Sequence, residues 1–456
     1  MASTLVAPQT AFRQVLSLSG PLVAGHAGNQ LMGFVDVAMV GRLGDVQLAA
    51  VAMGNGIYFA LTLLAGGCVF GMDALVSQAI GAGETARARR LLWQGLRLAT
   101  LLGFPAMLLI GVAPLLLEPC GVDAETATQT LWFSWSRLLG VIPFLWFCAT
   151  RSYLQALHRT RPIVIATILA NVVNFIGNGL LIYGDVALEG IGLPGIGLPA
   201  LGVVGSGLAS SIASIAAVVV LARAVRRTPA PLDPTRRAPD RELQRRILIV
   251  GAPVGFHIVA EIGVFTLVGV LAGTMSPTTA ASHQIALTLA SFTFTVVMGI
   301  AAATSVVVGH AVGRGDTPGA RAAGIAGLRI STVFMSATAL VFFLAPLSLA
   351  RILTDSEPVA LVAAPLILVA AVFQISDGIQ CIAGGALRGA GDTRVTFWAH
   401  MVSHYGIALP LSLLLAYKFG LGATGLWWGL ALGLSVVAVF LTVRFFRITS
   451  RAIARV

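Results

Sequence analysis

Four acidic residues lie inside long apolar stretches of this sequence: Asp36, Asp73, Glu261 and Asp377. A charge at the centre of a bilayer costs roughly 2.5–3.5 kcal/mol on insertion scales, so an acid kept there usually faces a bundle interior and has a function. A carboxylate in such a place can hold a proton, bind Na⁺ or receive a cationic ligand. These four residues are therefore the first candidates for chemistry.

Neutral partners for Asp36 are present in another apolar stretch. Asn174 and Asn178 are four residues apart, so they share one face of a helix and could both reach a carboxylate. The alternative interpretation is that these amides only join neighbouring helices through hydrogen bonds.

Glu261 and Asp377 each lie in the middle of an apolar stretch. If the two stretches are neighbours, the pair makes a site for a hard cation such as Na⁺, or for a shared proton. Asp73 lies nearer the end of its stretch and could instead satisfy local backbone or loop arginine groups. No Lys or Arg is expected at the depth of these acids, Arg137 being the nearest, so the sequence predicts no internal ion-pair partner.

The histidines give weaker signals. His257 precedes Glu261 by one helical turn and either tunes that acid or has a structural role. His400 and His404 are four residues apart, but no acid accompanies them in the sequence, so no metal site is predicted there. The chain also lacks a Walker A motif and a CxxC pair, which leaves ATP hydrolysis and redox chemistry without support.

The elements that hold these residues are predicted from composition. Of 456 residues, 57% are hydrophobic and only 10% charged, against about 25% charged in soluble proteins, and the mean hydropathy is +0.91. An all-α polytopic membrane protein is expected, because nothing alternates as a β-barrel would. Twelve stretches are long enough to span a bilayer: 14–40, 47–76, 92–117, 129–149, 162–184, 198–222, 246–272, 280–310, 324–350, 359–386, 395–417 and 421–443.

Most of the basic residues fall before the first stretch, in alternate connections or in the tail. Because Lys and Arg mark the cytoplasmic side, both termini are predicted to be cytoplasmic. The net charge of +11 then reflects topology, and no nucleic-acid partner is expected. Residues 1–12 do not resemble a cleavable signal peptide.

The two halves of the chain resemble each other. Pro21 and Pro253 are separated by the same interval as Gly81 and Gly313, since 253 − 21 equals 313 − 81. The chain is therefore divided into an N-lobe (1–222), a cytoplasmic linker (223–245), a C-lobe (246–443) and a cytoplasmic tail (444–456). Two six-helix bundles related by a parallel repeat would place a cavity between them and work by rocking.

Several motifs resemble one transporter family. Met32-Gly33-Phe34-Val35-Asp36 resembles the first helix of the multidrug and toxic compound extrusion (MATE) family, especially its NorM-type bacterial branch. Gln78–Gly83, His283-Gln284-Ile285-Ala286 and Gln374-Ile375-Ser376-Asp377 are similar to further segments of that family. These motifs occur in order along nearly the whole chain.

The resemblance implies a cation-coupled antiporter that exports organic cations and drugs, with Na⁺ or H⁺ as coupling ion. It implies no enzymatic activity and no cofactor, and a monomer in the bilayer is expected. Residues implied for ion coupling and substrate binding are Asp36, Asn174, Asn178, Glu261 and Asp377, with Na⁺ assigned to the last two. Secondary candidates are Asp73, His257, Gln284 and Phe373, the last of which stands where NorM-type members often have Tyr.

Two other functions fit the sequence less well. A flippase for lipid-linked oligosaccharides would want Arg inside its cavity for an anionic substrate, and the predicted membrane core is almost empty of Arg. An intramembrane glycosyltransferase would need acids near the loops and a sizeable aqueous domain, whereas these acids are deep and the loops short.

Overall fold

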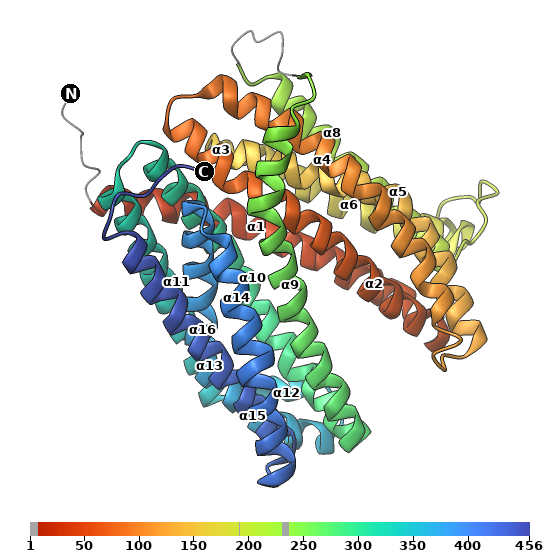
Figure 1. Cartoon of the computed structure of the whole chain (residues 1–456). Helices are drawn as coiled ribbons and strands as arrows, with labels where there is room; N and C mark the ends of the chain where they lie inside the picture. Colours follow the sequence, from red (N-terminus) through yellow and green to blue (C-terminus); the bar gives the residue numbers. More distant parts are fainter. Residues whose placement is uncertain (1–7, 191, 230–236) are drawn as a thin grey trace. The chain divides into compact units, whose positions relative to one another are not determined.

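The computed structural model describes residues 8–190, 192–229 and 237–456. Every regular element in these ranges is helical (Figure 1). The longer helices are α1 (Pro8–Val40), α2 (Asp45–Val69), α3 (Gly71–Gly81), α4 (Thr85–Val112), α5 (Ala124–Ala156), α6 (Arg161–Tyr183), α8 (Val203–Arg226), α9 (Arg241–Met275), α10 (Pro277–Gly313), α11 (Thr317–Leu344), α13 (Glu357–Ala390), α14 (Thr393–Met401) and α16 (Gly422–Ile448). The shorter elements are η1 (Ala113–Leu116), α7 (Asp185–Glu189), α12 (Pro346–Leu353), α15 (Leu409–Leu413) and the π-helices η3 (Val402–Ala408) and η4 (Leu414–Lys418).

The fold is that of an all-α polytopic membrane protein. Eleven helical segments of the described chain are long and apolar enough to cross a membrane, as judged by length and composition. They match the second to twelfth predicted stretches, and α1 covers the first. α1 is a 33-residue helix but is not among the eleven, because Arg13, His26, Asn29 and Gln30 dilute its apolar character.

The internal repeat extends to the helix boundaries. The interval between the first residues of α2 and α10 (277 − 45) equals that between α4 and α11 (317 − 85) and that between α6 and α14 (393 − 161). Gly83 and Gly315 follow the ends of α3 and α10 and both have positive φ, 78° and 73°. Each turn therefore uses a left-handed backbone conformation, which glycine adopts at little cost.

The contacts divide the chain into two compact units. We call Ala24–Met72 with Glu84–Gly255 the N-unit, and Met1–Val23, Asp73–Gly83 and Phe256–Val456 the C-unit. The predicted lobes follow the chain order, whereas these units assign residues 1–23 and 73–83 to the C-unit. Of the predicted linker, residues 230–236 lie outside the described residues, and the predicted tail begins inside α16.

Small residues bring the helices of each unit close together. In the N-unit α8 packs on α5 and α6, and a Cβ at Gly205 would lie only 2.3 Å from the carbonyl oxygen of Leu181. In the C-unit α13 packs on α10, α11 and α16 (Figure 1), and a Cβ at Gly389 would lie 2.3 Å from the carbonyl oxygen of Ser305. Close backbone approach at small residues is typical of helix packing in membranes.

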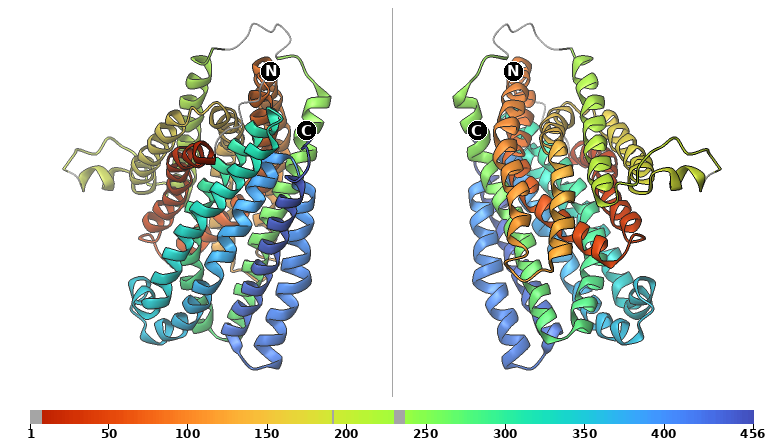
Figure 2. Two further views of the ribbon diagram at one scale, coloured as in Figure 1. Left: turned by 90° about the vertical axis from the view of Figure 1, so that its left-hand side faces the viewer. Right: turned by 90° about the vertical axis from the view of Figure 1, so that its right-hand side faces the viewer.

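Several large apolar side chains are exposed on the surfaces of the helices. Exposed examples include Leu101, Phe104 and Leu108 on α4, Ile165, Ile168 and Phe175 on α6, and Val333 and Phe343 on α11. Such faces suit lipid rather than water. The loop that carries α7 extends away from the helices of the N-unit (Figure 2).

Candidate functional site

Asp36 lies at the centre of a buried polar cluster in the N-unit. Its side chain is on α1, where it is only 1% exposed. Asn174 and Asn178 on α6 both donate to Asp36 Oδ1, at 2.8 and 2.7 Å, and the Ser210 hydroxyl on α8 donates to Oδ2 at 2.7 Å. The i,i+4 spacing of the two asparagines brings both amides to one carboxylate, so three neutral donors hold this acid in place.

A cation also reaches Asp36, and the prediction of no internal ion-pair partner was wrong for this acid. Arg137 on α5 lies with its Nη1 3.9 Å from Asp36 Oδ2. The same guanidinium donates to Asn55 Oδ1 and stands 4.0 Å from the ring centroid of Tyr58. Arg137 lies about two-fifths of the way along α5 (Ala124–Ala156), and its long side chain reaches Asp36 from there.

A small cavity opens beside this pair within the N-unit. Its volume is about 60 Å³, and its walls include Met32, Asp36, Tyr58, Phe59, Arg137 and Phe144. Sites for drug-sized ligands usually occupy about 300–1,000 Å³. In this conformation the cavity therefore has room for water or a small ion, and a dye would need the helices to move apart.

Glu261 and Asp377 come together in the C-unit. The Gln380 amide nitrogen lies 2.9 Å from Glu261 Oε1 on α9 and 3.2 Å from Asp377 Oδ1 on α13. One amide thus connects the two carboxylates, and Asp377 is 7% exposed. Within the described residues no Lys or Arg forms an ion pair with either acid. The arrangement can accommodate a proton or a cation with oxygen ligands.

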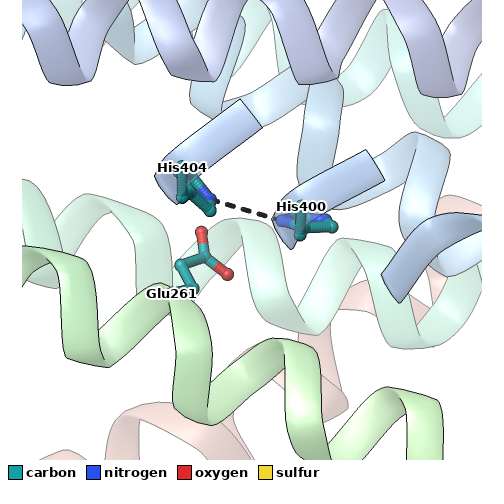
Figure 3. Close-up of side chains that lie close together, drawn as sticks. All are labelled: Glu261, His400 and His404. Carbon is teal, nitrogen blue, oxygen red and sulfur yellow. Dashed lines mark hydrogen bonds between the residues drawn. The ribbon is translucent and has the colours of Figure 1, made fainter. Parts of the chain in front are cut away.

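The histidines next to this pair are closer to an acid than the sequence predicted. One ligand atom each of Glu261, His400 and His404 lies within 4.8 Å of the others, a geometry that could hold a metal ion (Figure 3). The expectation that no acid accompanies His400 and His404 was therefore wrong, because the acid comes from α9. His257, one turn before Glu261, stacks on His400 with ring centroids 4.7 Å apart.

The secondary candidates lie in different surroundings. Phe373 is buried and stacks on Trp427 at a centroid distance of 5.7 Å. Gln284 is exposed on α10, where its amide lies 3.5 Å from the Thr288 hydroxyl. Asp73 on α3 lies 3.9 Å from Nε of Arg388, which belongs to the last turn of α13 and not to a loop.

Three residues of these clusters were missed by sequence reasoning. Arg137 lies too near the end of its predicted stretch to indicate a contact with Asp36, while Ser210 and Gln380 are uncharged and carry no signal of their own. For Gln380 one clue existed, since it follows Asp377 by three residues and so shares its helix face.

Comparison with known proteins identifies the family. The MatE family model matches residues 21–180 and again 253–414. The two matches therefore begin at Pro21 and Pro253, the prolines that mark the repeat. The chain is 34% identical over 451 residues to a probable multidrug resistance protein NorM of Bradyrhizobium diazoefficiens, covering 97% of this chain and 94% of that protein. It is 33% identical over 471 residues to a multidrug resistance protein NorM of Burkholderia vietnamiensis, covering 100% and 98%.

Solved structures show the same fold. An outward-facing multidrug resistance MATE family transporter of the MOP superfamily superposes with a TM-score of 0.86 at 19% identity, covering 99% of both chains. The fold and the two matches of the family model thus define a membrane transporter built from an internal repeat. The chain belongs to the MATE family and to its NorM-type branch.

Proposed function

We propose that this chain is a secondary active multidrug efflux antiporter, which exports lipophilic organic cations in exchange for Na⁺ or H⁺. The observation that carries the proposal is the pair Glu261 and Asp377, joined by the Gln380 amide without a Lys or Arg partner in the described residues. Holding Asp377 buried and Glu261 partly buried without a compensating cation is costly. A proton or Na⁺ from one side of the membrane would remove that cost, which is what coupling requires.

The Asp36 cluster supports a second place for coupling. Protonation of Asp36 on Oδ2 would disturb the bond from Ser210 and remove the charge that faces Arg137, while Oδ1 could still accept from the two asparagines. The pair therefore has two states with different hydrogen-bond networks, as a coupled conformational change needs.

Alternating access then follows as the proposed cycle. Cation binding at the acids favours drug release outside, and cation release inside allows drug to bind again from the cytoplasm or the inner leaflet. Each inward charge gains about 2.3 kcal/mol per 100 mV. The aromatic side chains Phe59 and Phe144 near the N-unit cavity suit a lipophilic cation.

Topology and assembly belong to the same proposal. The transporter lies in the bacterial inner membrane with both termini in the cytoplasm and acts as a monomer. It needs no cofactor, nucleic acid or enzymatic step.

A flippase for anionic lipid-linked sugars is the weaker candidate. Arg137 does line the N-unit cavity, but Asp36, Asn55 and Tyr58 already satisfy its guanidinium. An anionic headgroup would thus have to compete with a carboxylate in place.

The test is ethidium efflux from cells that express Asp36→Asn or Asp377→Asn, with Asp355→Asn as the matched control. Asp355 is exposed between α12 and α13, so its variant should match the wild type. We expect each site variant to lose at least about tenfold in rate, which corresponds to about 1.4 kcal/mol. Wild-type rates in both site variants, at equal protein levels, would overturn the proposal.

A further inference from the structure

We infer that Glu261, His400 and His404 form a binding site for a divalent transition-metal ion, with Zn²⁺ as the reference ligand. The site goes beyond the coupling proposed above, because Na⁺ and H⁺ need only the carboxylates. Two imidazoles change the ligand preference of this part of the C-unit.

The three side chains converge from two parts of the chain. Glu261 projects from α9, while His400 lies at the end of α14 and His404 belongs to the π-helix η3 that follows it (Figure 3). A π-helical turn is wider than an α-helical turn, and such turns are frequent at functional sites. The Tyr405 hydroxyl donates to the Ala260 carbonyl at 2.9 Å, so η3 and α9 are joined directly beside the candidate ligands.

The distances suit a tetrahedral ion better than a hydrogen bond. His400 Nδ1 and His404 Nε2 are 3.4 Å apart, which is long against the usual range of about 2.7–3.2 Å for N–H donors. With Zn–N bonds of about 2.0–2.1 Å, two ligands of a tetrahedral zinc are about 3.3 Å apart. The two rings already have that spacing, and the 4.8 Å limit for the whole group leaves a short movement for the Glu261 carboxylate.

Burial gives a second observation. His400 and His404 are 1% and 0% exposed, so water is kept away from the nitrogens that face each other. His404 presents Nε2 to His400 Nδ1, and these are the two nitrogens that would ligate the ion.

The ligand set selects the kind of metal. Imidazole nitrogen suits Zn²⁺, Cu²⁺, Ni²⁺ and Fe²⁺, whereas Na⁺, Mg²⁺ and Ca²⁺ prefer oxygen. Two imidazoles and one carboxylate also form a set that leaves a fourth position for water. His257 stacks on His400 and Gln380 donates to Glu261, so both candidate ligands are oriented by neighbours.

The binding test uses the purified full-length protein in detergent, titrated with Zn²⁺ in a calorimeter. We expect one Zn²⁺ per chain. His400→Gln, His404→Gln and Glu261→Gln should each weaken binding at least about 100-fold, since even the loss of an outer-shell partner typically costs 10–100-fold. His158→Gln is the matched control because His158 is exposed between α5 and α6. Cys381 follows Gln380 on α13 and lies near Glu261 and Asp377. Cys381→Ser tests whether this thiol, rather than the histidines, holds the metal.

A second test measures the visible spectrum of Co²⁺ bound to the wild-type protein, so its outcome does not depend on whether the variants fold. The spectrum should show a nitrogen and oxygen ligand set of low coordination number, without the intense thiolate bands that Cys381 would add. The inference is overturned by the absence of Zn²⁺ binding, by equal affinity in wild type and His404→Gln, or by loss of binding in Cys381→Ser.

A consequence for transport rests on the proposed function. Zn²⁺ would occupy the Glu261 carboxylate and tie α9 to η3, so it should inhibit ethidium efflux by the wild type but not by His404→Gln. If the wild type exports no ethidium, the proposed function is contradicted, whereas the Zn²⁺-binding result is unaffected. Efflux that Zn²⁺ inhibits equally in both proteins would contradict inhibition through this site.

Discussion

Arg137 and Asp36 form a buried pair across α5 and α1, with Nη1 and Oδ2 3.9 Å apart. The two side chains are 9% and 1% exposed, so solvent screens their attraction little. Three further donors hold the carboxylate, and Asn55 and Tyr58 hold the guanidinium. The pair is therefore the electrostatic centre of the N-unit.

Removal of one partner from this pair should cost more than removal of both charges. Arg137→Met leaves the buried carboxylate without a cation, and breaking a buried pair typically costs about 3–5 kcal/mol. The double variant Asp36→Asn with Arg137→Met should recover part of that loss. Unfolding of the purified variants in detergent measures both effects. If the loss of unfolding free energy in the double variant equals the sum of the losses in the two single variants, the residues are not coupled.

Close packing of α13 on α10 gives a sharp test of the fold. Gly389→Val should destabilise the protein by about 1–3 kcal/mol or prevent folding, because a Cβ there would lie 2.3 Å from the Ser305 carbonyl oxygen. Gly384→Ala is the matched control on the same helix, since its nearest neighbour would be 3.7 Å away. Thermal unfolding compares the two, and equal midpoints would contradict the close approach.

Asp185 should make the loop around α7 sensitive to acid. Hydrogen bonds from the backbone N–H groups of Leu198, Ile196 and Gly197 lower the pKa of the Asp185 carboxyl below its ordinary value. A group whose pKa is lower in the folded state stabilises above its unfolded pKa, and that stabilisation is lost as the pH falls through the folded pKa. The loop should therefore stay ordered at neutral pH and loosen below about pH 4.

Amide hydrogen exchange, corrected for the intrinsic pH dependence, measures this effect. The three amides should be protected at pH 7 and lose protection in strong acid, and Asp185→Ala should remove it at both pH values. Asp123→Ala is the control, because Asp123 caps α5 through Thr126 at a different loop. Unchanged protection in Asp185→Ala would contradict the account.

The helices and the repeat could be predicted because both depend only on the order of residues along the chain. Apolar runs give the spans, and a constant separation such as Gly81 to Gly313 needs no three-dimensional information. The Asn174 and Asn178 pair could be proposed for Asp36, since an i,i+4 spacing fixes a common face. The π-helical turn at His404 has no comparable signal, and residues 230–236 of the predicted linker lie outside the described chain.

Other contacts between distant segments could not be predicted in this way. Arg137 and Asp36 lie far apart along the chain, and their meeting depends on where α5 begins and how α1 lies beside it. Likewise Glu261 comes long before His400 in the sequence, so a histidine pair that seemed to lack an acid has one in space. Helix packing decides both cases.

The most direct test of cation coupling uses the purified protein in proteoliposomes, with Na⁺ and pH gradients imposed separately. Ethidium should move in the direction opposite to the flow of the coupling cation, and its transport rate should rise when the gradient of that cation is applied. Asp377→Asn should not show this rise in rate. Transport by the wild type at the same rate with either gradient and with none would contradict the claim that buried carboxylates couple cation entry to drug export.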